Sequence, residues 1–320
     1  MPKIVFSLIF SLLFAVLITF FPWEILRNNN QIFVDIQNYV YRIEATRQYG
    51  LTYFNVGETW IDYLKNEYLW ILILSLIASS KLNPFLALKL ISLFSAFVYH
   101  RFLSQGIGNV LAFIFLLNPI TISLINSQVR SAFAFSLFLL ALMIFKRPKL
   151  IYGTIPFLVF IHSAMFLIVV LYIVLQWFAN HCRRTPQFKV FMVACGAIFV
   201  AIFVSKFIPP IMSLLEDRRN TLEYENSSIL YVIFWLIWGG MLIEARRRKL
   251  TDDWKYLFAI MICVSVPVMT AMGFPGFRFL SMAFPLVMIS LPKLGFWRQA
   301  FACLAWVYYQ AILFDYWIIA

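Results

Sequence analysis

The chain has 320 residues, of which 63% are hydrophobic and only 12% are charged. Its apolar runs repeatedly reach the roughly 20 residues needed to cross a hydrocarbon core of about 30 Å, which predicts a polytopic membrane protein. A net charge of +12 would suggest nucleic-acid binding in a soluble protein. Here most lysines and arginines lie in short loops between apolar segments, where they set orientation, so no nucleic-acid partner is implied. The four cysteines do not indicate a disulfide framework.

The first apolar run, residues 4–21, follows Lys3 and is predicted to be an uncleaved helix that runs outward. It delivers a long polar segment, about residues 23–67, to the extracytoplasmic side. Within that segment polar and apolar positions repeat at i, i+4 and i+7 on neighbouring faces, which predicts an amphipathic helix at the membrane interface. The polar positions are Asp35, Tyr39 and Arg42, and the apolar ones are Ile36, Val40 and Ile43.

The next apolar run, residues 68–80, is short for a full crossing. The loop charges place both of its ends on the outer side, so we predict a re-entrant or interfacial helix that begins at Glu67. Helices over about residues 84–103 and 110–125 then cross inward and outward.

A central helix is predicted over residues 126–147, with Arg130 one turn inside its outer end and Lys146 and Arg147 at its inner end. Placing an arginine at a membrane face costs free energy unless an anion or water meets it. Arg130 is therefore a functional candidate.

The following apolar run, residues 149–177, is too long for one untilted crossing, and both of its flanks are basic. Two short helices that meet near His162 and Ser163 satisfy this pattern and place His162 on the outer side. A single long helix is the alternative.

Five further helices are predicted over about residues 189–208, 229–243, 255–272, 279–291 and 300–317. The prediction is thus a single, all-α transmembrane domain, residues 1–320, with about eleven crossings and a short re-entrant or interfacial helix. Arg278 follows an outer loop and is the counterpart of Arg130.

This topology gathers six charged or titratable residues on the extracytoplasmic side: Asp35, Arg42, Glu67, Arg130, His162 and Arg278. Arginine can hold phosphate oxygens with two parallel hydrogen bonds, and histidine can act as an acid or base. The structural alternatives are that the arginines extend to the interface or pair with loop carboxylates, and that His162 is satisfied by a neighbouring helix.

Motifs for metal and nucleotide chemistry are missing from the sequence. It has no G-x-x-x-x-G-K-[ST] loop, no H-E-x-x-H and no clustered Cys/His set. The Asp252-Asp253 pair lies in a predicted cytoplasmic loop and lacks D-x-D spacing. We therefore expect a reaction without a metal or cofactor.

Four segments follow one another in a fixed order: an Asp-x-x-Asn-Tyr (Asp35, Asn38, Tyr39), a Glu that opens a short helix (Glu67), an Asn-x-x-x-Arg-x-x-x-Ala (Asn126, Arg130, Ala134) and an Ile-His-Ser-Ala (161–164). In this order and spacing the chain resembles bacterial polysaccharide polymerases of the Wzy and EpsG type. The resemblance spans about residues 33–170, and Arg278 matches a later extracytoplasmic arginine. The family's Gly before the early Asp is absent, and one helix precedes the loop where two are usual.

The resemblance implies a membrane fold similar to that of lipid-linked-donor (GT-C-like) glycosyltransferases, in the inner membrane with its active site facing the periplasm. The implied reaction joins oligosaccharide units carried on undecaprenyl pyrophosphate, with a flippase and a chain-length regulator as partners. Arg130 and Arg278 would hold the donor pyrophosphate and His162 would assist the leaving phosphate, while Asp35 or Glu67 would orient or deprotonate the acceptor. Tyr39, Arg42 and Asn126 are assigned to substrate binding. The alternatives are a flippase or exporter of lipid-linked sugars, a glycan ligase or a membrane acyltransferase.

Overall fold

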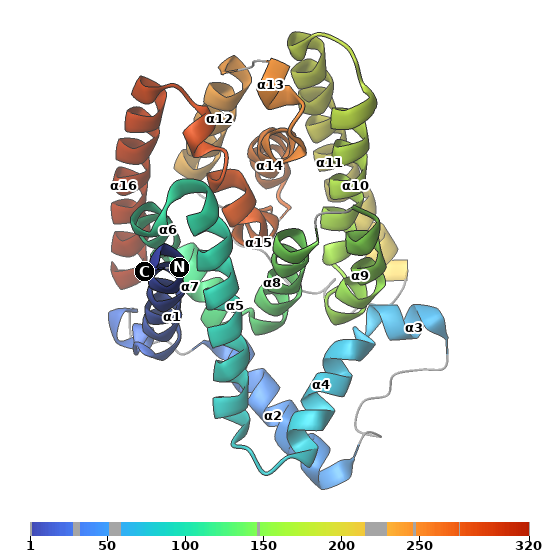
Figure 1. The fold of residues 1–320 in the computed structure, drawn as a ribbon. Helices are drawn as coiled ribbons and strands as arrows, with labels where there is room; N and C mark the ends of the chain where they lie inside the picture. The colour runs from blue at the N-terminus through green and yellow to red at the C-terminus, as the bar shows by residue number, and fades with distance from the viewer. Residues whose placement is uncertain are drawn as a thin grey trace. The chain divides into compact units, whose positions relative to one another are not determined.

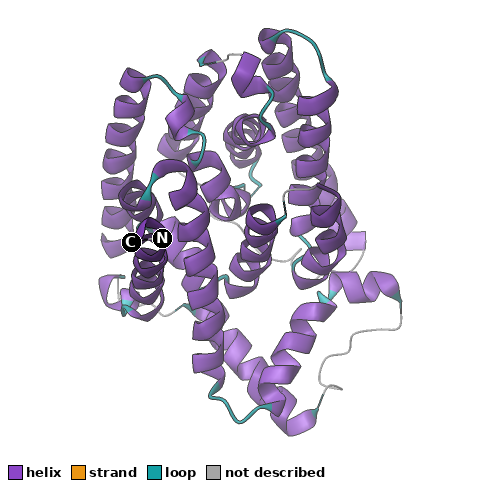
Figure 2. Ribbon diagram, in the orientation of Figure 1, coloured by secondary structure: helices purple, strands orange, loops and turns teal. Residues whose placement is uncertain are grey.

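The computed structural model describes residues 2–27, 33–50, 59–145, 148–214, 229–245, 248–274 and 276–319, and the regular elements in these ranges are all helices (Figures 1 and 2). Three of them are long and apolar enough to cross a membrane: α5 (Pro84–Ile107), α11 (Pro186–Leu214) and α14 (Trp254–Ala271). A bent pair, α6 (Asn109–Leu116) and α7 (Pro119–Asn126), makes a fourth if it counts as one span. The predicted all-helical class is confirmed, but the count of eleven crossings is not, because seven other apolar helices have only 10–17 residues.

The remaining helices are α1 (Pro2–Phe20), η1 (Trp23–Leu26), α2 (Val34–Tyr49), α3 (Trp60–Lys65), α4 (Tyr68–Ser79), α8 (Val129–Ile144), α9 (Pro148–Ile161), α10 (Met165–His181), α12 (Ile229–Glu244), α13 (Arg248–Thr251), α15 (Phe277–Met288), η5 (Leu291–Lys293) and α16 (Phe296–Ile319).

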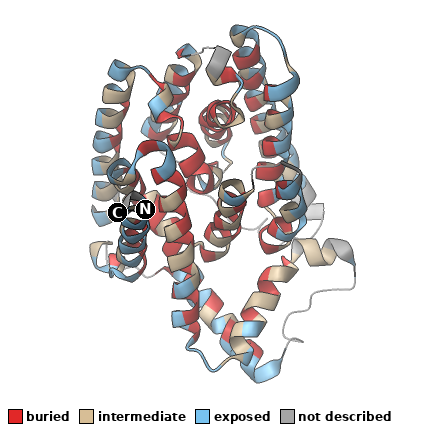
Figure 3. Ribbon diagram, viewed as in Figure 1, coloured by how far each residue is buried: buried red, intermediate tan, exposed pale blue. Residues whose placement is uncertain are grey.

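The chain forms two compact units, described separately below. The first comprises Met1–Val169 and Gln310–Ala320, and the second comprises Val170–Tyr309. In the first unit α5 packs against α1 and α8, and α8 also packs against α9. The buried residues line α5 and α8 (Figure 3), among them Leu88, Tyr99 and Phe135. These apolar contacts hold α8, the helix that carries Arg130, in place.

The second unit is organised around α14, which packs against α11, α12 and α15. Its apolar side chains include Trp235, which is fully buried. The two adjacent carboxylates that precede α14 pair with lysines, Asp252 with Lys189 and Asp253 with Lys293. The Asp pair therefore tethers neighbouring elements of this unit.

The predicted helix over residues 110–125 is wrong in one respect, because the structure breaks it into α6 and α7 with an 80° bend. Asn118 and Pro119 cause the break. The Asn118 side chain accepts a hydrogen bond from the Thr121 amide at 2.9 Å and caps α7, while proline at the first helical position fits a helix start. Gln310 donates from Nε2 to the carbonyls of Ile114 and Leu117 at 2.9 and 3.1 Å, so backbone acceptors at the break are satisfied.

The predicted central helix also begins later than expected. Asn126 is the last residue of α7, and α8 starts at Val129, so Arg130 is the second residue of α8. The basic residues Lys146 and Arg147 lie outside the described residues.

Two local predictions in the first unit are confirmed. The short helix α4 has 12 residues, and Glu67 stands at its N-cap. The run over residues 149–177 forms two helices, α9 and α10, and His162 and Ser163 lie in the break between them. The single-long-helix alternative is thereby excluded.

The predicted amphipathic helix is present as α2, with Ile36 and Ile43 buried and Asp35 exposed. The face prediction is wrong for Tyr39, which is 8% exposed and packs edge-on against Trp70 of α4 with ring centroids 5.3 Å apart. The aromatic contact buries it because α2 packs directly against α4.

Arg47, in the last turn of α2, joins the two helices. Its guanidinium donates to the carbonyls of Ala78, Ser80 and Leu82 at 3.1, 3.1 and 2.6 Å, so it satisfies acceptors at the end of α4. We expect Arg47→Ala to lower the melting temperature of the purified protein. Because Arg47 is exposed, the free energy of unfolding should fall by only about 1 to 2 kcal/mol. Arg184→Ala, at an exposed arginine of the second unit, is the control. Equal melting temperatures for the two variants would contradict this role.

Candidate functional site

The site is built around Glu67, the residue that directly precedes α4. Its backbone has φ 54 and ψ 58, in the left-handed region, and no other non-glycine residue in the described ranges has positive φ. Such a conformation costs free energy of order 1 to 3 kcal/mol, and structures retain it where surrounding contacts over-determine it. The residue is also 2% exposed. A buried carboxylate on a strained backbone needs strong partners.

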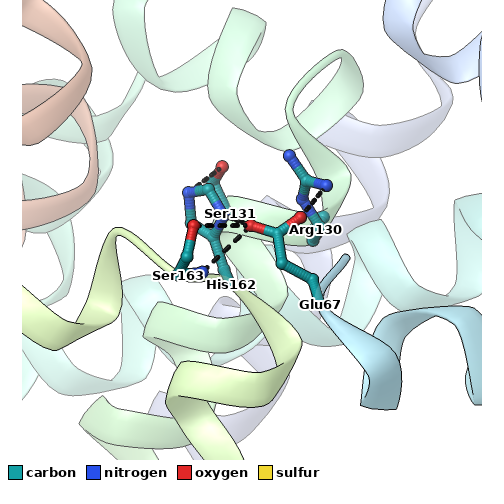
Figure 4. Close-up of polar contacts among 5 residues, drawn as sticks. All are labelled: Glu67, Arg130, Ser131, His162 and Ser163. Atoms are coloured by element: carbon teal, nitrogen blue, oxygen red, sulfur yellow. Dashed lines mark hydrogen bonds and ion pairs between the residues drawn. The ribbon is translucent and has the colours of Figure 1, made fainter. Parts of the chain in front are cut away.

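Four donors surround the two carboxylate oxygens (Figure 4). Oε1 lies 2.9 Å from His162 Nδ1 and accepts from the Ser163 amide at 2.9 Å and from the Ser163 hydroxyl at 3.0 Å. Oε2 pairs with Nη1 of Arg130. Charged hydrogen bonds of this kind are about twice as strong as neutral ones, so they hold Glu67 in its unusual conformation.

Arg130 projects toward Glu67 from the first turn of α8. The side chain of Glu67 is 3% exposed and that of Arg130 is 16% exposed, so the pair is largely withdrawn from solvent. Removing one partner of a buried pair leaves an uncompensated charge, which typically costs 3–5 kcal/mol. Glu67 therefore fixes the position of the guanidinium and compensates its positive charge at the N-terminal end of α8.

His162 occupies the break between α9 and α10. Its backbone amide still donates to the Leu158 carbonyl at 3.0 Å, and its carbonyl accepts from the Met165 amide at 2.9 Å, so the break is short and ordered by hydrogen bonds. The ring spans two partners, with Nδ1 facing Glu67 and Nε2 lying 3.0 Å from the Ser131 hydroxyl. A residue 8% exposed is thus fixed at both nitrogens.

Tyr39 of α2 lies within the electrostatic field of this cluster. Burial raises the pKa of Tyr39, and the positive charge of Arg130 partly opposes that rise. Asp35 and Glu67 raise the pKa further, whereas Arg42 lowers it. The phenol therefore stays neutral at physiological pH and can donate a hydrogen bond. Tyr39 and Arg42, both assigned to substrate binding, lie on α2, and the positive charge of Arg42 acts on the phenol of Tyr39.

The structure gives Asn126 contacts within the protein. It is fully buried, and its amide donates to the carbonyls of Ile18 and Ile122 at 2.9 and 3.1 Å, while its oxygen accepts from Lys89 at 2.9 Å. Asn126 thus ties α7 to α1 and α5. A packing role explains it better than the predicted substrate contact.

The other predicted residues lie elsewhere. Asp35 is exposed in the first turn of α2. Arg278 belongs to the second unit, where it is an exposed residue in the first turn of α15 and its carbonyl accepts from the Ser281 hydroxyl at 2.9 Å. The structure thus joins Glu67, Arg130 and His162 in one cluster.

Two serines, Ser131 and Ser163, complete the cluster through their contacts with His162 and Glu67, and neither was predicted as a site residue. Ser131 follows Arg130 directly, and Ser163 follows His162 directly. Both stand beside residues that were singled out, and adjacency to a charged or titratable residue at a helix end is the signal that points to them.

The cluster can hold an anion, polarise a hydroxyl and move a proton. No group of three or more His, Cys, Asp or Glu with metal-binding arrangement occurs in the part of the chain that the structure describes. Comparison of the chain with protein-family models, with curated proteins and with solved structures gives no match.

Proposed function

We propose that this chain is a bacterial O-antigen or exopolysaccharide polymerase, a metal-independent glycosyltransferase of the inner membrane. It joins oligosaccharide repeat units carried on undecaprenyl pyrophosphate, and its site faces the periplasm. The growing chain leaves its lipid carrier and is transferred to the non-reducing end of a new unit. A flippase that supplies the units and a chain-length regulator are the expected partners.

The observation that carries this proposal is the buried Arg130–Glu67 pair beside His162. Arg130 has the most exposed side chain of these three residues, at 16% against 10% for His162 and 3% for Glu67. A guanidinium has five donors in a planar fork and binds phosphate oxygens through charged, parallel hydrogen bonds. A pyrophosphate that is both lipid anchor and leaving group fits this requirement, because its negative charge grows as the glycosidic bond breaks.

The contacts refine the roles implied by the family resemblance. Both oxygens of Glu67 are engaged by Arg130, His162 and Ser163, so its role is to position them. Asp35, which is exposed, is the carboxylate proposed to orient the acceptor sugar. Arg278 enters this proposal from the sequence alone, as a second ligand of the donor pyrophosphate.

The lack of related halves in the sequence favours an enzyme over a flippase. A transporter of the same substrate is expected to be built from internal repeats, with its charges near the membrane midplane. The sequence shows no such repeat. A glycan ligase uses the same lipid-linked donor, and the experiment below separates it.

We expect Arg130→Ala to lower chain formation about 100-fold or more, because a charge-stabilising donor is lost. Arg130→Lys should rescue it poorly, because lysine lacks the two-point grip on phosphate. The measurement is the surface polysaccharide of the source bacterium on gels, in a strain whose only copy is the variant, with membrane insertion verified. Arg184→Ala, at an exposed arginine, is the control.

The polymerase proposal predicts that the long ladder disappears while lipid A core capped with a single unit remains. Loss of all capped product would indicate a flippase or ligase. A ladder as long as that of the Arg184→Ala strain would contradict the role of Arg130.

A further inference from the structure

Both ring nitrogens of His162 are occupied within the protein. Nδ1 lies 2.9 Å from Glu67 Oε1, and Nε2 lies 3.0 Å from the Ser131 hydroxyl (Figure 4). A substrate atom therefore reaches His162 only if one of these contacts breaks. At Nε2 the contacting group is the hydroxyl of Ser131, so a proton from another molecule can reach this nitrogen through that hydroxyl without displacing it.

The hydrogen bonds around Glu67 determine which ring nitrogen of His162 is the donor and which is the acceptor. The two carboxylate oxygens face an arginine, a histidine, a hydroxyl and a backbone amide. Only an ionised carboxylate accepts from all of them, and such a carboxylate has no proton to donate. Nδ1 must therefore carry the hydrogen that points to Glu67. In the neutral ring Nε2 then has a lone pair, which accepts the proton of the Ser131 hydroxyl.

The resulting order, carboxylate to imidazole to serine hydroxyl, is the order of the groups in serine hydrolases, where it makes the hydroxyl a proton donor to histidine. Ser131 is 7% exposed, which keeps bulk water from competing for these bonds. The hydroxyl oxygen retains lone pairs that can take up another proton. A proton can thus pass through Ser131 to His162 without displacement of the ring.

Ser131 also stands next to the arginine that is proposed to hold the donor. Both residues lie in the first turn of α8, a helix of 16 residues, whose N-terminal end carries partial positive charge. Arg130 and His162 both contact the carboxylate of Glu67, and the Ser131 hydroxyl contacts His162. The guanidinium and the hydroxyl therefore belong to one cluster, so an anion held by Arg130 would lie near the proposed proton path.

We propose that Ser131 is a catalytic residue of the glycosyl transfer and relays the proton of the acceptor sugar to His162; this inference rests on the proposed function. The acceptor oxygen forms a bond to the anomeric carbon of the donor, whose bond to the pyrophosphate oxygen breaks and leaves its electron pair on the pyrophosphate. The acceptor proton moves to Ser131 Oγ as the original Ser131 proton moves to His162 Nε2. Glu67 stabilises the imidazolium, which later returns the proton to solvent.

The test uses purified protein in lipid nanodiscs and, as substrate, lipid-linked repeat units extracted from a strain of the source bacterium that lacks this gene. Ser131→Ala is expected to lower kcat about 100-fold or more with little change in KM, because it removes one step of general base catalysis. Ser136→Ala is the matched control, since Ser136 is a fully buried serine of the same helix and its hydroxyl donates to the Phe133 carbonyl at 2.8 Å.

A pH profile separates a relay from a structural role. The wild type and Ser136→Ala should lose kcat at acidic pH, because a protonated His162 accepts no proton, and Ser131→Ala should lose this acid limb. His162→Gln should be as slow as Ser131→Ala, and the double variant should be no slower, because the two residues act as one unit. Ser131→Thr keeps the hydroxyl and should retain activity within about tenfold.

Three results would overturn the proposal. The first is a kcat for Ser131→Ala equal to that of Ser136→Ala; if the wild type still forms polymer, the proposed function stands without the relay. The second is covalent labelling of Ser131 by a fluorophosphonate probe that His162→Gln abolishes, which would make Ser131 a nucleophile. The third is a wild-type protein that forms no polymer from these units, which removes the proposed function and the relay together.

Discussion

Glu67→Gln should lower the free energy of unfolding by about 3 to 5 kcal/mol, because it leaves the buried guanidinium of Arg130 without its counter-charge. The amide also has only one oxygen, so its NH2 group must face either Arg130 at the Oε2 position or the three donors of His162 and Ser163 at the Oε1 position. The expected observation is a large fall in the melting temperature of the purified protein in detergent.

Glu44→Gln is the control for this variant, because Glu44 is an exposed glutamate of α2 in the same unit. The double variant Glu67→Gln/Arg130→Met removes both charges and should regain part of the lost stability, since no buried charge is left unpaired. If Glu67→Gln melts at the temperature of Glu44→Gln, the ion pair is not a structural element of this site.

Trp70→Ala should lower the free energy of unfolding by about 3 to 5 kcal/mol, the usual cost of truncating a large buried aromatic side chain. Trp70 is 1% exposed and packs between Tyr39 of α2, at 5.3 Å, and Phe133 of α8, at 6.5 Å between ring centroids. The cavity would loosen α4, whose N-cap is Glu67, so activity should fall together with stability.

Trp70→Phe should cost much less, because it keeps an aromatic ring and the indole Nε1 has no hydrogen-bond partner among the described residues. Trp297→Ala, at a tryptophan that is 82% exposed, is the control. Thermal unfolding followed by tryptophan fluorescence compares the three variants. Equal melting temperatures for Trp70→Ala and Trp297→Ala would contradict the packing role.

The length of apolar runs and the charges that flank them predicted two features of the fold, the break at His162 and the short helix α4. The length of the run over residues 149–177 and its basic flanks predicted the break at His162, and the short apolar run after Glu67 predicted α4. The break between α6 and α7 also has a local signal, an Asn-Pro pair that caps and starts a helix, and hydropathy alone does not detect it. The count of eleven spans stays unconfirmed, because hydropathy marks apolar runs and does not set the length of each helix.

Some residues of the site were predictable from the local sequence, whereas others depend on contacts between distant segments. Charges at helix ends made Glu67, Arg130 and His162 candidates, and these three meet in the structure. The contact between Ser131 and His162 joins positions 31 residues apart, and no periodicity encodes such a pairing. The burial of Tyr39 likewise followed from its packing on Trp70, which an isolated helix cannot reveal.

The left-handed backbone at Glu67 has a consequence for how this position can change in evolution. Glycine and asparagine adopt that conformation most readily, yet neither supplies the carboxylate that holds Arg130 and His162. The backbone conformation thus favours glycine or asparagine at this position, whereas the contacts with Arg130 and His162 require a carboxylate. A lineage that lost the activity would be released from the chemical demand, and substitution of Glu67 by glycine or asparagine would then mark the loss.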